Sequence, residues 1–221
     1  MNDKKIYPAI VASIVKDVPK YTIESKEASL MMRIFAKIMF FAPNFLHHFV
    51  TTIGARTYEP ETDIKANAWG VIAHEGVHAR DDLRLGVKFK IAYLFPQCLA
   101  PLAALAALAF VSPWFLLALV FLLALAPWPA PGRVWAELRG YLMSGCMDAL
   151  SGTDILAPSY IDWMVEHFCS GQYYFMYWGR AKMRAQIITL MMQAQRLVRG
   201  TEVLEPYTST IAVARAADKA A

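Results

Sequence analysis

The sequence contains little cysteine and little charge, and these shortages exclude several classes of protein. Its three cysteines lie far apart and form no CxxC pair, so we expect neither a disulfide framework nor a cysteine-rich metal site; they are Cys98, Cys146 and Cys169. Charged residues make up only 18% of the 221 residues, against about a quarter in an ordinary soluble domain. The net charge is a mild +4, without a dense Lys/Arg run. We therefore expect no nucleic-acid partner.

A secretory signal is also missing from the first residues. The segment MNDKKIYPAIVASIVKDVPKYT mixes charges into a short apolar run, so we do not expect secretion by that route. Residues 1–28 are expected to form a weakly structured lead-in or a short helix. The C-terminal VARAADKAA is expected to fray.

Charge is absent altogether from residues 91–132. This block is longer than the roughly 20 residues of one α-helical membrane span, and Ser112 and Pro113 divide it. We expect two helices of about 16 to 20 residues, folded as a hairpin that crosses and returns. Trp114 and Trp128 lie at the break and the exit, where aromatic anchors often sit. We interpret residues 91–131 as a transmembrane or re-entrant hairpin in contact with membrane lipid, the alternative being a hairpin buried in a soluble protein.

Three segments before this block have recognisable patterns. SLMMRIFAKIMFFAPNFLHHFV, with Arg33 and Lys37 four apart, indicates an amphipathic helix broken near Pro43, either against the core or at a membrane surface. The β-branched VTTIGARTYEP predicts a strand in a small sheet or hairpin. The following ETDIKANAWGVIAHEGVHARDDLRLG predicts a helix, capped by Asp63 and ended by Gly86.

Helical patterns also follow the charge-free block. Residues 133–152 and 180–200 each predict a helix, the latter ended by Gly200, and residues 158–179 predict a helix and an aromatic-rich segment. The elements together predict a mainly α chain with a small β-sheet or hairpin, and a hydrophobic helical hairpin inserted between two helices. A length of 221 residues suits one domain over residues 1–221.

Two histidines four residues apart occur in VIAHEGVHARDD. Positions i and i+4 share one face of a helix, so His74 and His78 present two imidazoles to one point. Glu75 directly follows the first histidine, which completes the HExxH arrangement of two metal ligands and a general base. Apolar residues before the motif suit a buried helix. The alternative is an ordinary helix that carries two surface histidines.

With this motif the chain resembles the HExxH zinc metallopeptidases, the zincins. The resemblance covers TTIGARTYEP, the helix with HEGVH and the helix with AELRGY. It implies a zincin-like α+β domain with one Zn²⁺ that hydrolyses peptide bonds. It also implies that TTIGARTYEP pairs with extended substrate, although a purely structural edge strand is an equal alternative. Arg80 departs from the pattern, because an apolar residue is more usual there.

A zinc site needs a third protein ligand, and several candidates are weak. Asp81 and Asp82 lie three and four residues past His78, a further helical turn from the metal; we expect them to orient a histidine or to pair with Arg80. His167 is isolated in the sequence. The pair His47 and His48 lacks helical spacing to the motif.

Glu137 is the better third ligand. It lies in WAELRGYLM, and an acid among apolar residues needs a partner such as a metal ion. The glutamate-type zincins, which the chain resembles, supply their third ligand from such a later helix. A salt bridge with Arg133 or Arg139 is the alternative for Glu137.

The charge-free block lies between the motif and Glu137, so its topology decides whether they meet. One membrane crossing would separate them, whereas two crossings return them to the same side. Both ends carry basic residues, which the positive-inside rule places in the cytoplasm: Lys88, Lys90, Arg133 and Arg139. This layout resembles that of integral-membrane prenyl-protein peptidases in arrangement only, since those enzymes have additional spans.

We therefore predict a membrane-associated zinc metallopeptidase, integral to the membrane, with its active site on the cytoplasmic side. Glu75 acts as general base on a metal-activated water, and the substrate is a peptide or protein. His167, Tyr173 and Tyr174 are conceivable oxyanion donors, although nothing in the sequence brings them to the metal. The alternative is a non-catalytic membrane protein with a structural metal or a membrane-perturbing role, and a non-peptide amide substrate stays open.

Overall fold

The structure is a computed structural model that describes residues 3–38, 45–61, 68–126, 128–171 and 176–220. The chain forms two compact units. Unit 1 comprises Met1–Leu85, Arg139–Ile155 and Met191–Ala221, and unit 2 comprises Gly86–Leu138 and Leu156–Leu190. The prediction of a single domain stays a prediction.

The described residues are mainly helical with one small mixed sheet, which confirms the predicted fold class. In unit 1, β1 (Thr22–Ser25) pairs parallel with β3 (Arg56–Glu59), and β3 pairs antiparallel with β2 (Thr51–Ile53). Gly54 begins the two-residue turn between β2 and β3 with a φ of 63°, which costs glycine little. The strand predicted in VTTIGARTYEP is therefore a hairpin. β1 was not predicted.

The N-terminal segment is a core element. α1 (Asp3–Asp17) buries Ile6, Ile10 and Ile14 completely, and this spacing of four places them on one face. Of the two alternatives for residues 1–28, the helix is the one found. It packs against α4 (Ala68–Leu85) and α9 (Tyr207–Lys219).

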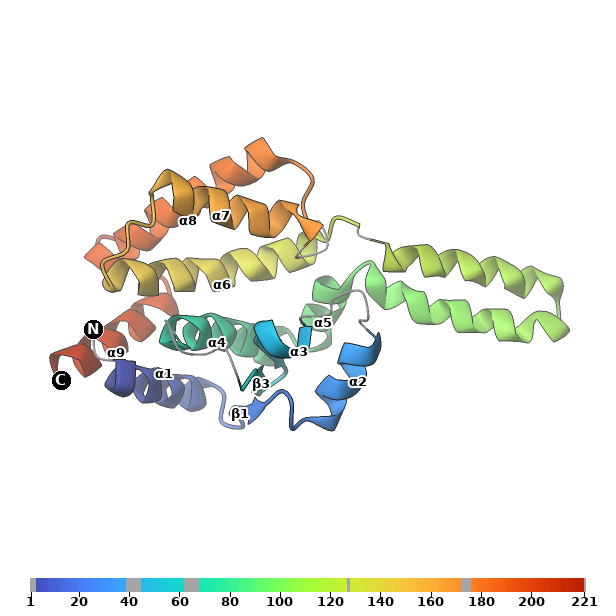
Figure 1. Ribbon diagram of the computed structural model, residues 1–221, viewed down its shortest axis with the longest axis horizontal. Helices are drawn as coiled ribbons and strands as arrows, with labels where there is room; N and C mark the ends of the chain where they lie inside the picture. The colour runs from blue at the N-terminus through green and yellow to red at the C-terminus, as the bar shows by residue number, and fades with distance from the viewer. Residues whose placement is uncertain (1–2, 39–44, 62–67, 127, 172–175, 221) are drawn as a thin grey trace. The chain divides into compact units, whose positions relative to one another are not determined.

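The prediction that VARAADKAA frays was wrong. Residues 213–219 of this segment belong to α9, which buries Tyr207, Ile211 and Ala214 and lies beside α1 in Figure 1. The buried residues Tyr207, Ile211 and Ala214 have i, i+4 and i+7 spacing, a helical signal that is visible in the sequence.

A buried lysine ties the sheet to the chain that follows it. Nζ of Lys26 donates to the carbonyl oxygens of Phe45 and Phe49, at 2.7 and 2.6 Å, and to Oγ1 of Thr51 at 2.9 Å. Burial lowers the pKa of Lys26 to about 8, and the negative charge of Glu75 opposes this fall. Lys26 thereby holds α3 (Phe45–His48) and β2 beside the end of β1.

The predicted helices around the motif are present. The amphipathic segment contains α2 (Leu30–Ile38) and α3, while its expected break near Pro43 lies outside the described residues. α4 carries the HEGVH motif and ends at Leu85, directly before Gly86, as predicted; its predicted cap, Asp63, also lies outside the described residues. The helices predicted after the block are α6 (Pro131–Leu150), α7 (Pro158–Cys169) and α8 (Arg180–Arg199).

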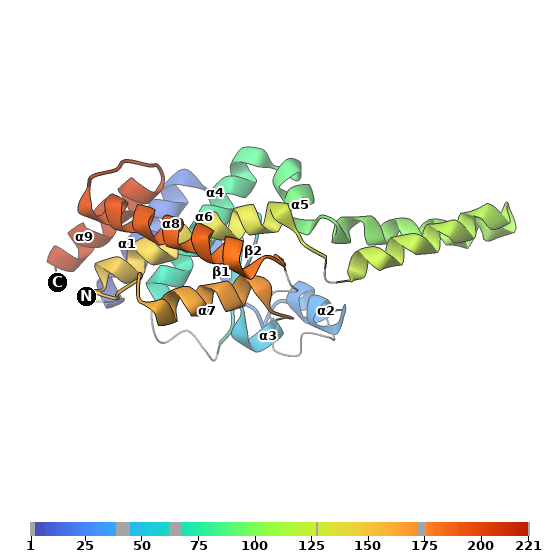
Figure 2. The ribbon, with the colours of Figure 1, turned by 90° about the horizontal axis from the view of Figure 1, so that it is seen from above.

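The charge-free block contains a helical hairpin in unit 2. η1 (Gln97–Phe110) and η2 (Pro113–Leu125) are 3₁₀ helices that run side by side in Figures 1 and 2, and their break falls at the predicted place. The legs of 14 and 13 residues are shorter than predicted, because Ile91 to Leu94 belong to α5 (Val87–Leu94).

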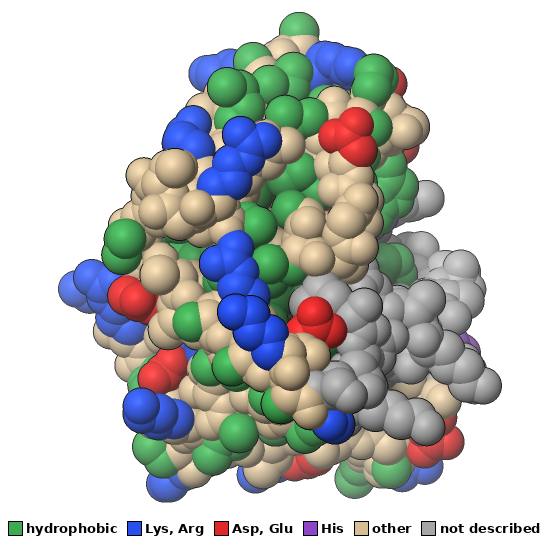
Figure 3. Space-filling view, turned by 90° about the vertical axis from the view of Figure 1, so that its left-hand side faces the viewer, with side chains coloured by type: hydrophobic (Ala, Val, Ile, Leu, Met, Phe, Trp, Pro, Cys, Tyr) green, Lys and Arg blue, Asp and Glu red, His purple; other side chains and the backbone are tan. Residues whose placement is uncertain are grey.

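Among the described residues, no single helix combines the length and the hydropathy of a membrane span. α5 and η1 meet the test together, but they are bent by 86° at the break between them, and η2 is a shorter apolar helix. On the face drawn in Figure 3, basic side chains lie interspersed with acidic and hydrophobic ones.

The buried stripe of α1 gives a stability prediction. Ile10→Ala should lower the free energy of unfolding by about 2–5 kcal/mol, because it leaves a cavity where α1 packs. The matched control is Val15→Ala on the same helix, where a side chain 39% exposed should cost within about 0.5 kcal/mol. Chemical denaturation followed by circular dichroism measures both. Equal, small losses would show that α1 is not a core helix.

Candidate metal centre

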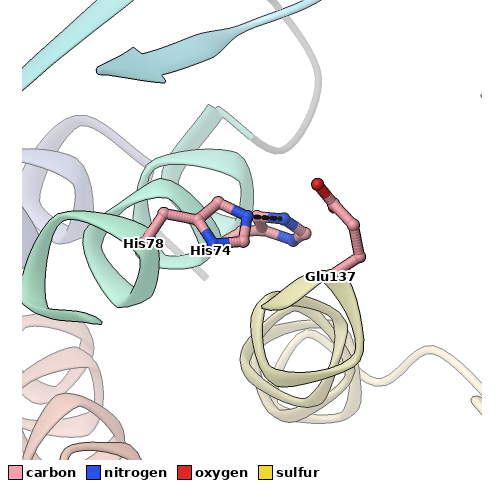
Figure 4. Close-up of side chains that lie close together, drawn as sticks. All are labelled: His74, His78 and Glu137. Carbon is pink, nitrogen blue, oxygen red and sulfur yellow. Dashed lines mark hydrogen bonds between the residues drawn. The ribbon is translucent and has the colours of Figure 1, made fainter. Parts of the chain in front are cut away.

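Three predicted ligands lie together. His74 and His78 from α4 and Glu137 from α6 point toward one another in Figure 4. All three are buried, and one ligand atom from each lies within 4.8 Å of the others. The two Nε2 atoms are 3.1 Å apart. Two nitrogen ligands of a tetrahedral zinc ion, each about 2.0–2.1 Å from the metal, would be about 3.3 Å apart. The group is therefore able to hold one metal ion.

The ring of His74 is fixed from its other side. Nδ1 of His74 lies 3.1 Å from Oγ of Ser144 on α6, and Tyr141 packs edge-on against the ring at 4.9 Å between centroids. If Nδ1 carries the proton and donates to Ser144, the lone pair of Nε2 faces the candidate metal position. This tautomer is the one that a metal ligand requires.

A glycine allows α6 to pass directly over His74. A Cβ atom at Gly140 would lie only 2.4 Å from Nε2 of His74 and 2.5 Å from its Cε1. Both atoms belong to a buried ring with little freedom to move. Glu137 precedes Gly140 by three residues on the same continuous helix, so the approach at Gly140 also brings Glu137 alongside the histidines.

A bidentate ion pair reinforces this approach. Nε and Nη2 of Arg139 donate to the two carboxylate oxygens of Asp81, at 2.7 and 2.9 Å. Arg80 donates instead to Asp17 at 2.7 Å. We expected Asp81 to orient a histidine or to pair with Arg80; it pairs with Arg139 instead and ties α4 to α6. Oδ2 of Asp82 lies near the β2–β3 turn, 3.5 Å from where a Cβ of Gly54 would be.

Glu75 is buried on the sheet side of α4. At about 100° per residue, it lies about 60° around the helix from His78. Burial raises the pKa of Glu59 on β3, and the negative charge of Glu75 adds to that rise. The carboxylate of Glu75 therefore lies beside the ligand pair and toward the sheet.

Glu137 has a hydrogen-bond donor that the sequence did not suggest. The hydroxyl of Tyr93, in the last turn of α5, donates to Oε1 of Glu137 at 2.7 Å. Gly140 and Ser144 were also missed, although a spacing of i, i+3 and i+7 from Glu137 could have placed them on its face of α6. No pattern of this kind connects Glu137 with Tyr93.

The remaining sequence candidates lie elsewhere or are not described. His47 is exposed and its Nδ1 lies 3.2 Å from Oε1 of Glu27. The ring of His167 packs on Trp163, and burial lowers its pKa while the charge of Glu137 opposes that change. The side chain of His48 and all of Tyr173 and Tyr174 fall outside the described residues.

No protein-family model matches this chain, and comparisons with curated proteins and with solved structures give no match either. The resemblance to the zincins therefore rests on the HEGVH motif and on the buried histidine–histidine–glutamate group.

The close approach at Gly140 predicts that even a methyl side chain at this position impairs metal binding. Gly140→Ala should lower the metal content of the purified protein, because the added methyl group displaces the His74 ring. Gly145→Ala is the matched control on the same helix. Its methyl group would meet the flexible end of the Met191 side chain, 2.8 Å from Sδ, and touch Cβ of Ala194 at 3.4 Å, so the metal content should be kept. Atomic absorption measures the metal. Equal metal contents in the two variants would contradict this account of the site.

Proposed function

We propose that this chain is a zinc-dependent metallopeptidase attached to a membrane. The observation that carries the proposal is the buried group of His74, His78 and Glu137, with Glu75 on the same helix as the histidines. Two imidazoles and a carboxylate are a donor set that suits zinc. In the described part of the chain the group has three members. Three protein ligands are typical of catalytic zinc sites, which keep one position for water or substrate.

Each residue of the motif then has a role. A bound zinc ion would supply a water of lowered pKa and polarise the carbonyl of the scissile amide. Glu75 takes the proton from the attacking water and delivers it to the leaving nitrogen. Ser144 and Tyr141 hold the ring of His74, and Asp81 keeps α6 against α4 through Arg139.

A peptide substrate fits the edge of the sheet. In the described part of the chain β2 is bonded to β3 alone, and it packs beside α4. An extended peptide could add to β2 by main-chain hydrogen bonds and reach the metal centre on the adjacent helix.

The general base gives the sharpest test of this function. Glu75→Gln should keep the bound zinc and lower peptide hydrolysis at least about a hundredfold, because an amide cannot accept the proton of the attacking water. The same substitution at exposed Glu166 on α7 is the control and should leave both unchanged. Mass spectrometry of a mixed peptide library, incubated with detergent-purified protein, detects cleavage.

Two outcomes would count against the enzyme. Hydrolysis that survives Glu75→Gln would remove Glu75 from the mechanism. Wild-type protein that binds zinc but cleaves no peptide in the library would favour the non-catalytic alternative with a structural metal.

Membrane attachment is supported by the large apolar side chains that the hairpin exposes, which a soluble protein would bury. Residues three apart line up in a 3₁₀ helix. The less exposed positions carry alanine and phenylalanine: Ala103, Ala106 and Ala109 on η1 and Phe115, Ala118, Phe121 and Ala124 on η2. The outward positions carry large apolar side chains, and Leu117, for example, is 65% exposed. On η1 the less exposed side chains are small alanines and the leucines face outward, an arrangement that suits a lipid environment.

The dimensions of the hairpin fit a bilayer. At about 2.0 Å per residue, the 14 and 13 residues of the two legs extend about 28 and 26 Å. The hydrocarbon core of a bilayer is about 30 Å thick. Trp128, at the exit, lies beside Trp178 with 6.3 Å between ring centroids, as expected for an aromatic anchor at the membrane surface.

The basic residues near both ends of the hairpin support a cytoplasmic active site. Lys88 and Lys90 are exposed on α5, and Arg133 lies at the start of α6. Under the positive-inside rule these ends stay in the cytoplasm, together with the metal ligands next to them in the chain.

Lipid insertion is tested by charges on the outward face of the hairpin. Leu105→Lys combined with Leu117→Lys should abolish flotation with phosphatidylcholine–phosphatidylglycerol vesicles, because each charge costs about 2.5–3.5 kcal/mol at the bilayer centre. The control is Val203→Lys, at a side chain 75% exposed outside the hairpin, and it should float like the wild type. Wild-type flotation of the double variant would contradict insertion.

A further inference from the structure

The side chain of Glu137 is held from the base of the hairpin. Its Oε1 accepts the hydrogen bond from Tyr93, which lies directly before the bend from α5 into η1. A carboxylate has two oxygens. The contact with Tyr93 involves one of them, Oε1, and restrains the rotamer of Glu137.

Tyr93 is itself held on several sides within unit 2. Nε of Arg133 donates to the carbonyl oxygen of Tyr93 at 3.3 Å, and the guanidinium carbon lies 5.3 Å from the centroid of the Tyr93 ring. Nη2 of Arg133 also donates to Oε1 of Gln97, the first residue of η1, at 3.2 Å. Arg133 therefore links Tyr93 to the hairpin, and it lies one helical turn before Glu137 on α6.

The backbones at the hairpin base are in direct contact. A Cβ at Gly132 would lie 2.2 Å from the carbonyl oxygen of Ala92, so only glycine allows α6 to begin this close to the end of α5. Ala92 precedes Tyr93 and Gly132 precedes Arg133. The close contact thus fixes the distance between α5, which carries Tyr93, and α6, which carries Glu137.

We propose that Tyr93 is a positioning residue for the metal ligand Glu137, through which the base of the hairpin sets the affinity of the centre for zinc. This inference rests on the metal site of the proposed function. Hydrogen-bond partners of metal ligands typically change metal affinity by about 10–100-fold when they are removed.

Tyr93→Phe tests the proposal because it removes only the hydroxyl group. The zinc dissociation constant of the variant, measured by competition with a chromophoric chelator, should rise about tenfold while helicity stays unchanged. Tyr177→Phe is the matched control. Tyr177 does not belong to the metal group, and its backbone N–H bond to Phe168 survives the substitution, so the zinc affinity should stay as it is.

A second variant addresses the link to the hairpin. Arg133→Gln should raise the zinc dissociation constant in the same direction, because Tyr93 loses the guanidinium that holds it. An unchanged zinc affinity in Arg133→Gln would overturn the role of the hairpin base.

Failure of this inference differs from failure of the proposed function. If the wild type binds zinc tightly and Tyr93→Phe binds it equally well, Tyr93 does not position Glu137, whatever the effect on hydrolysis. A wild type that binds no zinc would overturn both proposals.

Discussion

The close approach of α4 and α6 at Gly140 is the constraint on which the candidate metal centre depends. A methyl group at this position would overlap the ring of His74, so the approach needs a glycine. Once α6 lies this near, Tyr141 and Ser144 reach the same ring, and Arg139 reaches Asp81 with both nitrogens. Glu137 follows because it shares the helix. The ion pair of Arg139 with Asp81 adds two charge-assisted hydrogen bonds between the helices.

The helix α6 positions the backbone of Glu137, and the hydrogen bond from Tyr93 restrains its side-chain rotamer. The charge-free hairpin begins and ends beside these two residues, and its large apolar side chains face outward. A chain segment with such a surface needs a partner that is itself apolar, and a bilayer provides one along its whole length. In this proposal the base of the hairpin does two things. It brings the chain back to α6, and through Tyr93 it holds the proposed third ligand, Glu137.

Much of this arrangement could be predicted from sequence, and what was missed has physical reasons. The HEGVH spacing predicted the histidine pair because helix geometry alone decides which residues share a face. Glu137 was predicted from its apolar neighbours, since a buried acid needs a partner. The role of Gly140 depends on the distance between two helices, and that of Tyr93 depends on how the hairpin returns, so neither was visible locally. Leu102, Leu105 and Leu108 do carry a three-residue period, a signal of 3₁₀ geometry that an α-helical interpretation overlooked. The helix α9 was missed although Tyr207, Ile211 and Ala214 have helical spacing in the sequence.

X-ray absorption at the zinc edge, on detergent-purified protein loaded with one equivalent of zinc, tests the central claim most directly. The account predicts two imidazole nitrogens near about 2.0–2.1 Å, with the other nearest ligands being oxygen from Glu137 and from water. Substituting Glu137 by alanine should leave the two imidazoles and change only the oxygen ligands. A spectrum with sulfur ligands, with more than two imidazoles, or with no change on loss of Glu137 would contradict a centre built from His74, His78 and Glu137.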